Sequence, residues 1–396
     1  MKCEKVKLSD VCDLIAGFAF KSKDFGDFED KVIKIADIVP PRVEMNRLRG
    51  INLSNYNKDK LEKFIAKPGD YVLAMTGATI GKIGRIYEKS AYINQRVLLF
   101  HPHKEIDKDF LYYTICAKPF YNYIINFVDS ETAQPNISAT TIGKYELYLP
   151  PLNTQEKIAS ILQLLDMKIE LNNAINNNLE QQAQAVYREM FVSNGVIASA
   201  TIADVSLNVT DGVHNTVHDD PDGKYFLLSC KNIKGGHLSI GTNERTINEE
   251  VFSKLRRRTN LSKGDILISS VGTVGELLLL NTEPTNYEFQ RSVAIVKPDP
   301  AIISAYYLYE ALTCQKAELI NAAHGAVQQC LFISDIAGFP IGIPEPEALL
   351  KFNSIVAPIF DTITANEAEN TTLCLMRDSL LPRLLSGEID VSDIDL

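Results

Sequence analysis

The sequence lacks the motifs of the common nucleotide-dependent and hydrolytic enzymes. It has no Gly-x-x-x-x-Gly-Lys-[Ser/Thr] loop, no Gly-x-Gly-x-x-Gly after an expected strand, no Gly-x-Ser-x-Gly elbow and no Asn-Pro-Pro-Tyr or Asp-Pro-Pro-Tyr methyltransferase motif. The nearest approach, at residues 77–82, has its glycines one residue too close, and Ile83 replaces the hydroxyl residue that would hold Mg²⁺. In a chain of 396 residues these absences favour a binding protein over an enzyme.

Metal-binding patterns are also scarce. The seven cysteines form no Cys-x-x-Cys pair and have no histidine at zinc-ligand spacing, so we expect reduced, buried thiols. Among the six histidines only His214 and His218 are spaced as a helical ligand pair, and their surroundings are typical of a loop. We therefore expect solvated histidines there and no metal site.

Long hydrophobic runs are missing as well. No apolar run approaches the roughly 18 to 20 residues of a membrane span, and the N-terminal residues lack the apolar core of a signal peptide. We expect a cytoplasmic protein that does not bind membranes. The net charge of −10 argues mildly against a nucleic-acid-binding protein, but the acidic residues gather late in the chain. Residues 1–150 carry 22 Lys and Arg against 19 Asp and Glu (+3), whereas residues 345–396 carry 3 against 10 (−7).

The chain contains an internal repeat. Matched segments lie roughly 194 to 195 residues apart, which is far longer than a solenoid period and indicates a duplicated domain. The first copy reads Lys67-Pro-Gly-Asp70, Thr76-Gly-Ala-Thr-Ile-Gly81 and Asn94-Gln-Arg96, and the second reads Lys263-Gly-Asp265, Ser270-Val-Gly-Thr-Val-Gly275 and Gln290-Arg291. Two similar modules can present two similar surfaces to a pseudo-two-fold object.

Each copy is expected to be an α+β module followed by a long helix. Short strand-forming runs are separated by turn formers, and one helix is expected at 109–127 in the first copy and at 304–322 in the second. The expected strands lie at 31–35, 70–74, 82–87, 96–100 and 145–149, and again at 225–229, 265–269, 276–280 and 292–296. The predicted domains are the modules 1–151 and 199–344 and the helical segments 152–198 and 345–396.

The run after Pro151 predicts a helix of about 38 residues, roughly 57 Å long, with Thr154 as its N-cap. Its seam alternates spacings of four and three, as in coiled coils, and includes two asparagines that would fix register at a cost in stability. A patchier seam follows residue 345, where Pro358 should kink the helix or delay its start. The seam residues are Ile158, Leu162, Leu165, Ile169, Asn172, Asn176, Leu179, Ala183, Val186 and Met190, then Ile355, Ile359, Leu373, Met376 and Leu380.

We expect these two helices to form an antiparallel coiled coil with pseudo-two-fold symmetry. The alternative is two independent amphipathic helices, each packed on its own module.

Three groups of residues are candidates for contact with a nucleic acid. The Gly-rich segments could offer hydroxyl and N–H groups to phosphates, or could be structural hairpins. Gln and Arg can read adenine and guanine edges, although amides also satisfy turns. A basic run in the second module is either a solvated face or a phosphate contact. The candidates are Thr76, Thr79, Lys82, Arg85, Asn94, Gln95, Arg96, Gln134, Asn136, Arg256, Arg257, Arg258, Thr273, Gln290, Arg291 and Gln328.

Several segments together resemble the specificity (S) subunits of type I restriction–modification systems, over essentially the whole chain. The strongest single match is Arg377-Asp-Ser-Leu-Leu-Pro-Arg-Leu-Leu-Ser-Gly-Glu-Ile389. The others are Lys67-Pro-Gly-Asp-Tyr-Val-Leu73, Thr76-Gly-Ala-Thr-Ile-Gly81, Gln134-Pro-Asn-Ile-Ser138, Leu149-Pro-Pro-Leu-Asn-Thr-Gln-Glu156 and Asp211-Gly-Val-His-Asn-Thr216. The sequence departs from the family at Pro358 and at residues 328–331, a poor second copy of 134–137.

The resemblance implies a non-catalytic DNA-binding subunit with two target-recognition domains that read the halves of a bipartite, asymmetric target. It implies that the paired helices fix the spacer and dock two methyltransferase (M) subunits, which restriction (R) subunits can join. It implies no cofactor on this chain, with S-adenosylmethionine, ATP and Mg on the partner subunits. A protein-assembly scaffold without base-specific DNA binding is the alternative function.

Overall fold

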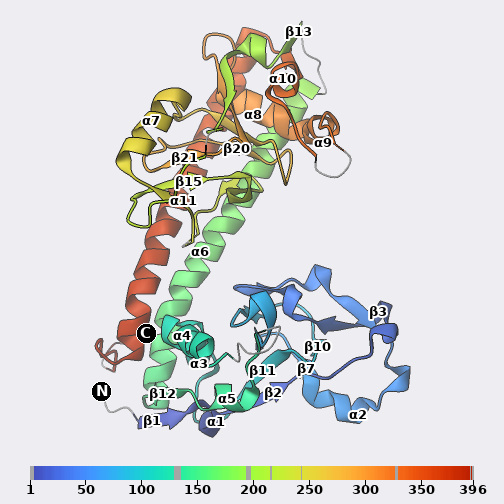
Figure 1. Cartoon of the computed structure of the whole chain (residues 1–396), viewed down its shortest axis with the longest axis vertical. Coiled ribbons are helices and arrows are strands. Elements are labelled where there is room, and N and C mark those ends of the chain that lie inside the picture. The colour runs from blue at the N-terminus through green and yellow to red at the C-terminus, as the bar shows by residue number, and fades with distance from the viewer. Residues whose placement is uncertain are drawn as a thin grey trace. The chain divides into compact units, whose positions relative to one another are not determined.

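The structure, a computed structural model, describes residues 4–128, 135–192, 198–214, 216–241, 243–325, 329–392 and 394. The chain divides into two compact units (Figure 1). Unit 1 comprises Met1–Ile169 together with Thr372–Leu396, and unit 2 comprises Glu170–Thr371. Each unit therefore contains one β-rich module and parts of both long helices.

Unit 1 is built on two sheets. One sheet has six strands in the order β2-β11-β8-β9-β5-β4, and the other has four in the order β6-β3-β10-β7, while β1 pairs separately with β12. The strands are β1 (Glu4–Lys7), β2 (Cys12–Ala16), β3 (Phe25–Ile33), β4 (Ile38–Val39), β5 (Arg42–Val43), β6 (Arg49–Ile51), β7 (Ile65–Ala66), β8 (Tyr71–Ala74), β9 (Ile83–Arg85), β10 (Ala91–Ile93), β11 (Val97–Pro102) and β12 (Glu146–Leu149).

The single helix expected at 109–127 is two helices in the structure. α3 (Lys108–Cys116) and α4 (Lys118–Asn126) are separated by Ala117, whose backbone is extended. Pro119 follows in the first turn of α4, where its missing N–H costs nothing, whereas inside one continuous helix it would remove a hydrogen bond and its ring would clash with the carbonyl of Ile115. The remaining helices of the module are α1 (Leu8–Val11), α2 (Lys58–Leu61) and α5 (Ala139–Gly143).

Unit 2 repeats this plan. Its main sheet has the order β14-β22-β19-β20, a second has the order β18-β15-β21, and β13–β23 and β16–β17 are separate pairs. The strands are β13 (Ala198–Thr201), β14 (Ser206–Asp211), β15 (Tyr225–Leu228), β16 (Ile233–Lys234), β17 (His237–Leu238), β18 (Thr246–Ile247), β19 (Ile266–Ser269), β20 (Leu277–Leu279), β21 (Tyr287–Phe289), β22 (Val293–Pro298) and β23 (Pro340–Ile343).

The helices of unit 2 show the same kind of break as those of unit 1. The helix expected at 304–322 is divided at Gln315 into α8 (Ala305–Cys314) and α9 (Lys316–Asn321). The other short helices are α7 (Glu249–Thr259) and α10 (Ile333–Ala337). In both units a parallel strand pair, β3–β10 and β15–β21, occupies the corresponding place in the second sheet. The duplication and the α+β class predicted from the sequence are therefore confirmed.

Two long helices follow the modules, α6 (Leu152–Tyr187) and α11 (Pro346–Leu385). α6 begins before Thr154, whose N–H donates to the Pro151 carbonyl oxygen, so Thr154 is not the N-cap. α11 does not start late, because it continues through the exposed Pro358. The ring of Pro358 can be accommodated on the exposed side of the helix.

The two helices pair, and they run antiparallel. In unit 2, Asn172 contacts Asn370 and Asn176 contacts Asn366, so positions rise along α6 as they fall along α11 (Figure 1). In unit 1, Asp166 of α6 pairs with Arg377 of α11 at 2.9 Å. The helices also insert into the module cores, so the alternative of helices packed on their modules is part of the structure too.

The buried seam of α6 follows the predicted positions closely, and that of α11 does not. Ile158, Leu162, Asn172 and Asn176 are almost fully buried, and Leu165, Ile169, Leu179 and Val186 are half-buried. On α11, Ile359, Leu373 and Leu380 are half-buried, but Ile355 and Met376 are 40% and 50% exposed. The buried positions are Phe352, Val356, Phe360, Ile363 and Leu384.

The shift has a physical cause: α11 packs against the core of unit 2 as well as against α6. Apolar residues therefore occur on more than one of its faces, and a strict heptad pattern does not select the buried one. The same composition makes α11 apolar enough to pass a length-and-hydropathy test for a membrane span, with a mean hydropathy of 1.2 in its most apolar window. Four of its large side chains are buried in the core of unit 2.

Candidate nucleic-acid interface

Three segments of unit 1 that carry predicted contact residues meet at one place. They are the β8–β9 connection, the turn between β10 and β11, and the chain after residue 134. The N–H of Met75 donates to the Arg96 carbonyl oxygen at 2.9 Å, and the N–H of Ile137 donates to the Met75 carbonyl oxygen at 3.0 Å. Thr76 and Asn136 form an isolated β-bridge. The structure thus brings the first-module candidates at 76–82, 94–96 and 136 together.

The Gly-rich segment of this cluster forms a hairpin connection with its own polar groups satisfied. Thr76 is 5% exposed, and its hydroxyl donates to the Pro135 carbonyl oxygen at 2.9 Å. The N–H groups of Gly77 and Gly81 donate to Pro135 and Ala74. Gly77 has a φ of +71°, which favours glycine. These contacts favour the structural-hairpin interpretation over a phosphate cradle built from Thr76.

The side chains that remain available in this cluster come from the β10–β11 turn and its neighbours. Gln95 and Lys82 are exposed. Arg96 is exposed and donates to Oδ1 of Asn136 at 3.4 Å. Asn94 is half-buried and its Oδ1 accepts the N–H of Gln95 at 2.9 Å, so Asn94 shapes the turn. The half-buried Thr79 donates weakly to the carbonyl oxygen of Thr76 at 3.4 Å.

Arg85, predicted as a phosphate contact, is instead part of the interior of unit 1. Its guanidinium pairs with Asp109 and lies 4.2 Å from the ring centroid of Tyr112, and its side chain is only 16% exposed. Burial disfavours the charged guanidinium, but the ion pair with Asp109 outweighs it, so the pKa of Arg85 is raised. Asp109 already neutralises the guanidinium of Arg85, so this charge is not available to a phosphate.

A glycine at the base of the turn allows the chains to approach closely. The N–H of Gly17 donates to Val97, and an added Cβ at Gly17 would lie 2.2 Å from the Asn94 carbonyl oxygen. Gly212 holds the matching place in unit 2, where a Cβ would lie 2.1 Å from the Phe289 carbonyl oxygen. Any other residue would push the β10–β11 or β21–β22 turn out of place.

Unit 2 contains the counterpart of this cluster. The N–H of Ser270 donates to the Ser292 carbonyl oxygen, and the N–H of Leu331 donates to the Ser270 carbonyl oxygen, both at 2.9 Å. Arg291 is exposed and Gln290 is half-buried beside Val213. Thr273 is exposed at the tip of the Gly-rich segment. The predicted second-module residues Thr273, Gln290 and Arg291 therefore lie in equivalent loops.

The three arginines of α7, Arg256 to Arg258, all make contacts within unit 2. Arg256 pairs with the fully buried Glu288, whose pKa is raised by burial and lowered in part by Arg256 and Thr259. Arg258 donates to the Gly212 carbonyl oxygen at 2.8 Å and pairs with Asp211 at 3.1 Å. Arg257 is exposed and donates to a carbonyl of its own helix. Arg257 and Arg258 are both exposed, but of the three arginines only Arg257 has no ion pair with a carboxylate among the described residues, as a phosphate contact would require.

The remaining predictions concern two glutamines, a metal site and the cysteines. Gln134 and Gln328 lie outside the described residues. Among the residues that the structure describes, no group of three or more His, Cys, Asp or Glu could hold a metal ion. The six described cysteines are free, but only Cys12 is buried; Cys116 is exposed and the others are half-buried. The expectation of buried thiols was wrong for most of them.

Two helix-pairing residues escaped the sequence analysis, Asn366 and Asn370 of α11. Nδ2 of Asn366 donates to Oδ1 of Asn176 at 2.7 Å, and Nδ2 of Asn172 donates to Oδ1 of Asn370 at 2.9 Å. The signal was present in the repeat, since Asn366 lies 194 residues after Asn172 and Asn370 lies 194 residues after Asn176. The four asparagines form what we call the asparagine ladder.

The chain is similar to proteins of one family. The model of the type I restriction modification DNA specificity domain matches residues 2–181. The MjaIX specificity subunit of Methanocaldococcus jannaschii is 24% identical over 351 residues, covering 83% of this chain and 79% of that protein. The EcoBI specificity subunit of Escherichia coli is 24% identical over 427 aligned residues, covering 97% and 86%.

A solved structure shares the fold. The type I restriction–modification S subunit from M. genitalium superposes with a TM-score of 0.56 at 15% sequence identity, covering 97% of this chain and 96% of that one. Its likeness extends over both modules and both long helices. By its family match over residues 2–181 and by its relatives, the chain is similar to the specificity (S) subunits of type I restriction–modification systems, and it shares the fold of one of them.

Proposed function

We propose that this chain, the non-catalytic subunit that recognises target DNA within a type I complex, reads an asymmetric target made of two separate half-sites. The domains 1–151 and 199–344 would each read one half-site, and the helical segments 152–198 and 345–396 would set their separation. The observation that carries the proposal is the loop cluster that occurs once in each module and presents exposed amide and guanidinium groups, Gln95 and Arg96 in one and Arg291 in the other.

The chemistry of these side chains suits base readout. Gln pairs bidentately with adenine, and Arg pairs bidentately with guanine, in the major groove. The two clusters differ in the charges beside them. Lys82 is exposed in unit 1, whereas the matching position in unit 2 is an acidic residue, Glu276. The matching Glu276 pairs with Lys316 at 2.7 Å and accepts the N–H of Gly235. This difference supports unlike half-sites and hence an asymmetric target.

The partner subunits would supply the chemistry. Two methyltransferase subunits would dock on the long helices, and restriction subunits would join them in the cytoplasm. On α6, Leu164 and Met167 of unit 1 are 59% and 63% exposed, and Leu171 of unit 2 is 55% exposed. Such apolar exposure supports a protein partner for the helices. S-adenosylmethionine, ATP and Mg would be bound by those subunits.

The test is equilibrium binding by the complex with its methyltransferase subunits. Selection from a randomised duplex library should recover one bipartite sequence, bound at least a thousandfold more tightly than random DNA at physiological salt. Gln95→Ala or Arg291→Ala should relax selection in one half-site only. Equal affinity for all duplexes, and indifference to both substitutions, would instead identify a protein-assembly scaffold.

A further inference from the structure

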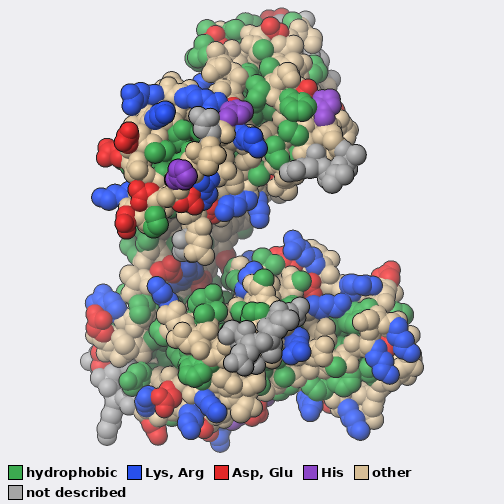
Figure 2. All heavy atoms as spheres, viewed as in Figure 1, with side chains coloured by type: hydrophobic (Ala, Val, Ile, Leu, Met, Phe, Trp, Pro, Cys, Tyr) green, Lys and Arg blue, Asp and Glu red, His purple; other side chains and the backbone are tan. Residues whose placement is uncertain are grey.

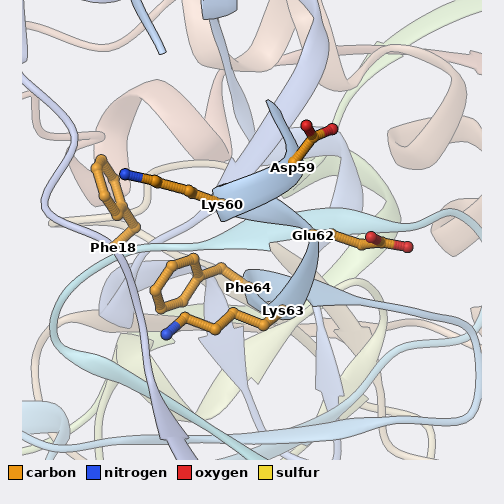
Figure 3. A pocket seen from close by; sticks show the side chains of 6 residues that line it. All are labelled: Phe18, Asp59, Lys60, Glu62, Lys63 and Phe64. Carbon is orange, nitrogen blue, oxygen red and sulfur yellow. The ribbon is translucent and has the colours of Figure 1, made fainter. Parts of the chain in front are cut away.

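Unit 1 has a shallow pocket beside the β10–β11 turn. Its volume is about 670 Å³. Figure 3 shows the six residues that line it, which come from the segment after β2 and from α2 and the following turn: Phe18, Asp59, Lys60, Glu62, Lys63 and Phe64. None of the six belongs to the loop cluster described above, so the pocket is a separate feature of unit 1.

The pocket has an aromatic floor that is fixed to the sheet. The N–H of Phe18 donates to the Ile93 carbonyl oxygen at 3.0 Å, which places Phe18 next to Asn94. The ring of Phe18 contacts those of Phe64, Phe20 and Tyr56, with centroids 5.0 to 5.7 Å apart. Phe18 is half-buried, so one part of its ring remains open to a ligand.

Two lysines border this floor. Lys60 and Lys63 are three residues apart and therefore lie on the same side of their helical segment. In Figure 3, Lys60 reaches toward the ring of Phe18 and Lys63 lies along Phe64, with its Nζ 5.0 Å from that ring centroid. The carboxylates of Asp59 and Glu62 project to the opposite side. Within the described residues, neither lysine has a carboxylate in ion-pair distance.

An anion with an apolar flank fits these groups. Two ammonium groups attract negative charge, while exposed ring faces need an uncharged surface, and a deoxyribose next to its phosphate offers both. Several Lys and Arg side chains also lie among apolar and other groups on the part of unit 1 that carries β3 and α2 (Figure 2). Since Phe18 is bonded to the strand that leads into the Asn94–Arg96 turn, DNA read by that turn would pass beside the pocket.

Unit 2 fills the corresponding place with its own side chains. Val213 pairs with Gln290 as Phe18 pairs with Asn94, and α7 follows β18 as α2 follows β6. Val213 packs against the core cluster that contains Phe252 and Leu255, and the ring of Phe252 stacks on Tyr225 at 4.1 Å. The open aromatic floor is therefore a feature of unit 1 among the described residues of the two modules.

We propose that Phe18, Lys60, Lys63 and Phe64 bind the sugar–phosphate backbone of the strand that flanks the first half-site. The inference rests on the proposed function, because it requires DNA at the neighbouring turn. Lys60 and Lys63 each contact a phosphate, and Phe18 packs against deoxyribose. The patch adds affinity and fixes the register of the first module on the duplex, and it does not select bases.

The experiment measures the salt dependence of DNA binding by the complex with its methyltransferase subunits. The probes are a duplex carrying the sequence methylated in the host and a scrambled duplex of equal length. The slope of log Kobs against log salt is negative. It should become less steep by about 0.9 in Lys60→Gln and in Lys63→Gln, and by about 1.8 in the double variant. The ratio of target to scrambled affinity should stay unchanged.

Three controls separate the possible causes. Asp59→Asn and Glu62→Gln change charge on the same segment by one unit but on its other side, and Lys144→Gln removes an exposed lysine elsewhere in unit 1. These variants should keep the wild-type slope. A slope that steepens with Asp59→Asn as much as it flattens with Lys60→Gln would show a general charge effect and overturn the contact.

The two proposals fail in different ways. A wild-type complex that does not distinguish target from scrambled DNA would refute base readout. A complex that distinguishes them, but whose slope is unaffected in the double lysine variant, would refute the backbone contact alone. Phe18→Leu should weaken both duplexes by the same factor without altering the slope, and a loss confined to the target would contradict the role given to Phe18.

Discussion

The amide of Asn172 in α6 donates a hydrogen bond to Oδ1 of Asn370 in α11 at 2.9 Å, and the reciprocal bond joins Asn366 to Asn176 at 2.7 Å. Asn366 and Asn370 are the counterparts of Asn172 and Asn176 in the 194-residue repeat, and each asparagine bonds to the counterpart of the other. This exchange is what an antiparallel pairing of two copies of one helix produces. Oδ1 of Asn172 itself is buried without a partner within the described chain. The ladder therefore contributes register more than maximal stability.

The ladder can be tested by a double-mutant cycle. Asn172→Ala, Asn370→Ala and the double variant should show a coupling of about 1 kcal/mol in the free energy of unfolding, measured by urea denaturation, because both single variants lose the hydrogen bond that joins the two side chains. The exposed Asn177, changed to Ala, is the matched control and should leave that energy unaltered. Additive single effects would contradict the coupling.

Arg85 should behave as a structural residue. Arg85→Ala leaves Asp109 without its partner and should lower the free energy of unfolding by about 3 kcal/mol, whereas Arg85→Met with Asp109→Leu should recover most of the loss. The salt slope of DNA binding by the folded complex should not change. Arg96 is exposed, so Arg96→Ala should have the opposite effects. It should weaken DNA binding and leave the thermal stability unchanged. A reduced salt slope in Arg85→Met with Asp109→Leu would restore the phosphate role.

Glu310 of α8 should make unit 2 less stable as pH rises. Burial, and to a lesser degree the nearby Glu180, raises the pKa of Glu310 to about 8 against an ordinary value of 4.5. The unfolded chain thus loses this proton first, and stability falls between about pH 4.5 and pH 8, by up to about 1.4 kcal/mol per pH unit.

The difference between variants isolates this effect. Glu310→Gln should match the wild type near pH 4.5 and be more stable by a few kcal/mol at pH 8, in urea denaturation followed across pH. The exposed Glu318, changed to Gln, should follow the wild-type curve throughout. Parallel curves for wild type and Glu310→Gln would mean that Glu310 ionises normally in the folded protein.

Gly17 should be intolerant of any side chain. Gly17→Ala forces a Cβ into the Asn94 carbonyl oxygen, and the backbone shift should cost about 1–3 kcal/mol and displace the Gln95–Arg96 turn. Target affinity should fall with it, as measured by equilibrium binding. Gly241→Ala, where the nearest neighbour is a Glu244 carboxylate at 3.4 Å, is the control and should be close to neutral.

The helices should act as a ruler between half-sites. Matching heptads inserted into α6 and α11 add about 10.5 Å of helix, which corresponds to about three base pairs at 3.4 Å each. Selection from a randomised library should then recover a spacer about three base pairs longer. A heptad in α6 alone should disrupt the pairing. An unaltered spacer in a stable double-insertion variant would exclude the ruler.

Much of the fold followed from local pattern. Short apolar runs such as 70–74 and 265–269 became β8 and β19 because strand-forming residues and the Gly-Asp turns before them are local signals. The breaks at Ala117 and Gln315 were missed because apolar spacing continues across them. On α11, apolar residues at both 355 and 356 left the buried face undecided until the core of unit 2 selected Val356.

The site was harder to predict, because the sequence does not show which carboxylate an arginine will pair with in the folded protein. Arg85, Arg256 and Arg258 resemble free cations, yet their carboxylates come from positions 24, 32 and 47 residues away. Only the tertiary fold brings those groups together. Gln95, Arg96 and Arg291 remain candidates because they lie in turns whose backbone is fixed and whose side chains are exposed.

Unit 1 combines two segments that are far apart in the sequence, and this has a consequence for biosynthesis. Leu384 and Val391 are buried in the same core as Leu8 and Phe110, and Lys157 donates to the Ser392 carbonyl oxygen at 2.6 Å. The first module to leave the ribosome must therefore wait for residues 372–392 before its packing is finished. Until then the nascent chain exposes part of that core, and premature termination late in the message would damage the module encoded at its beginning.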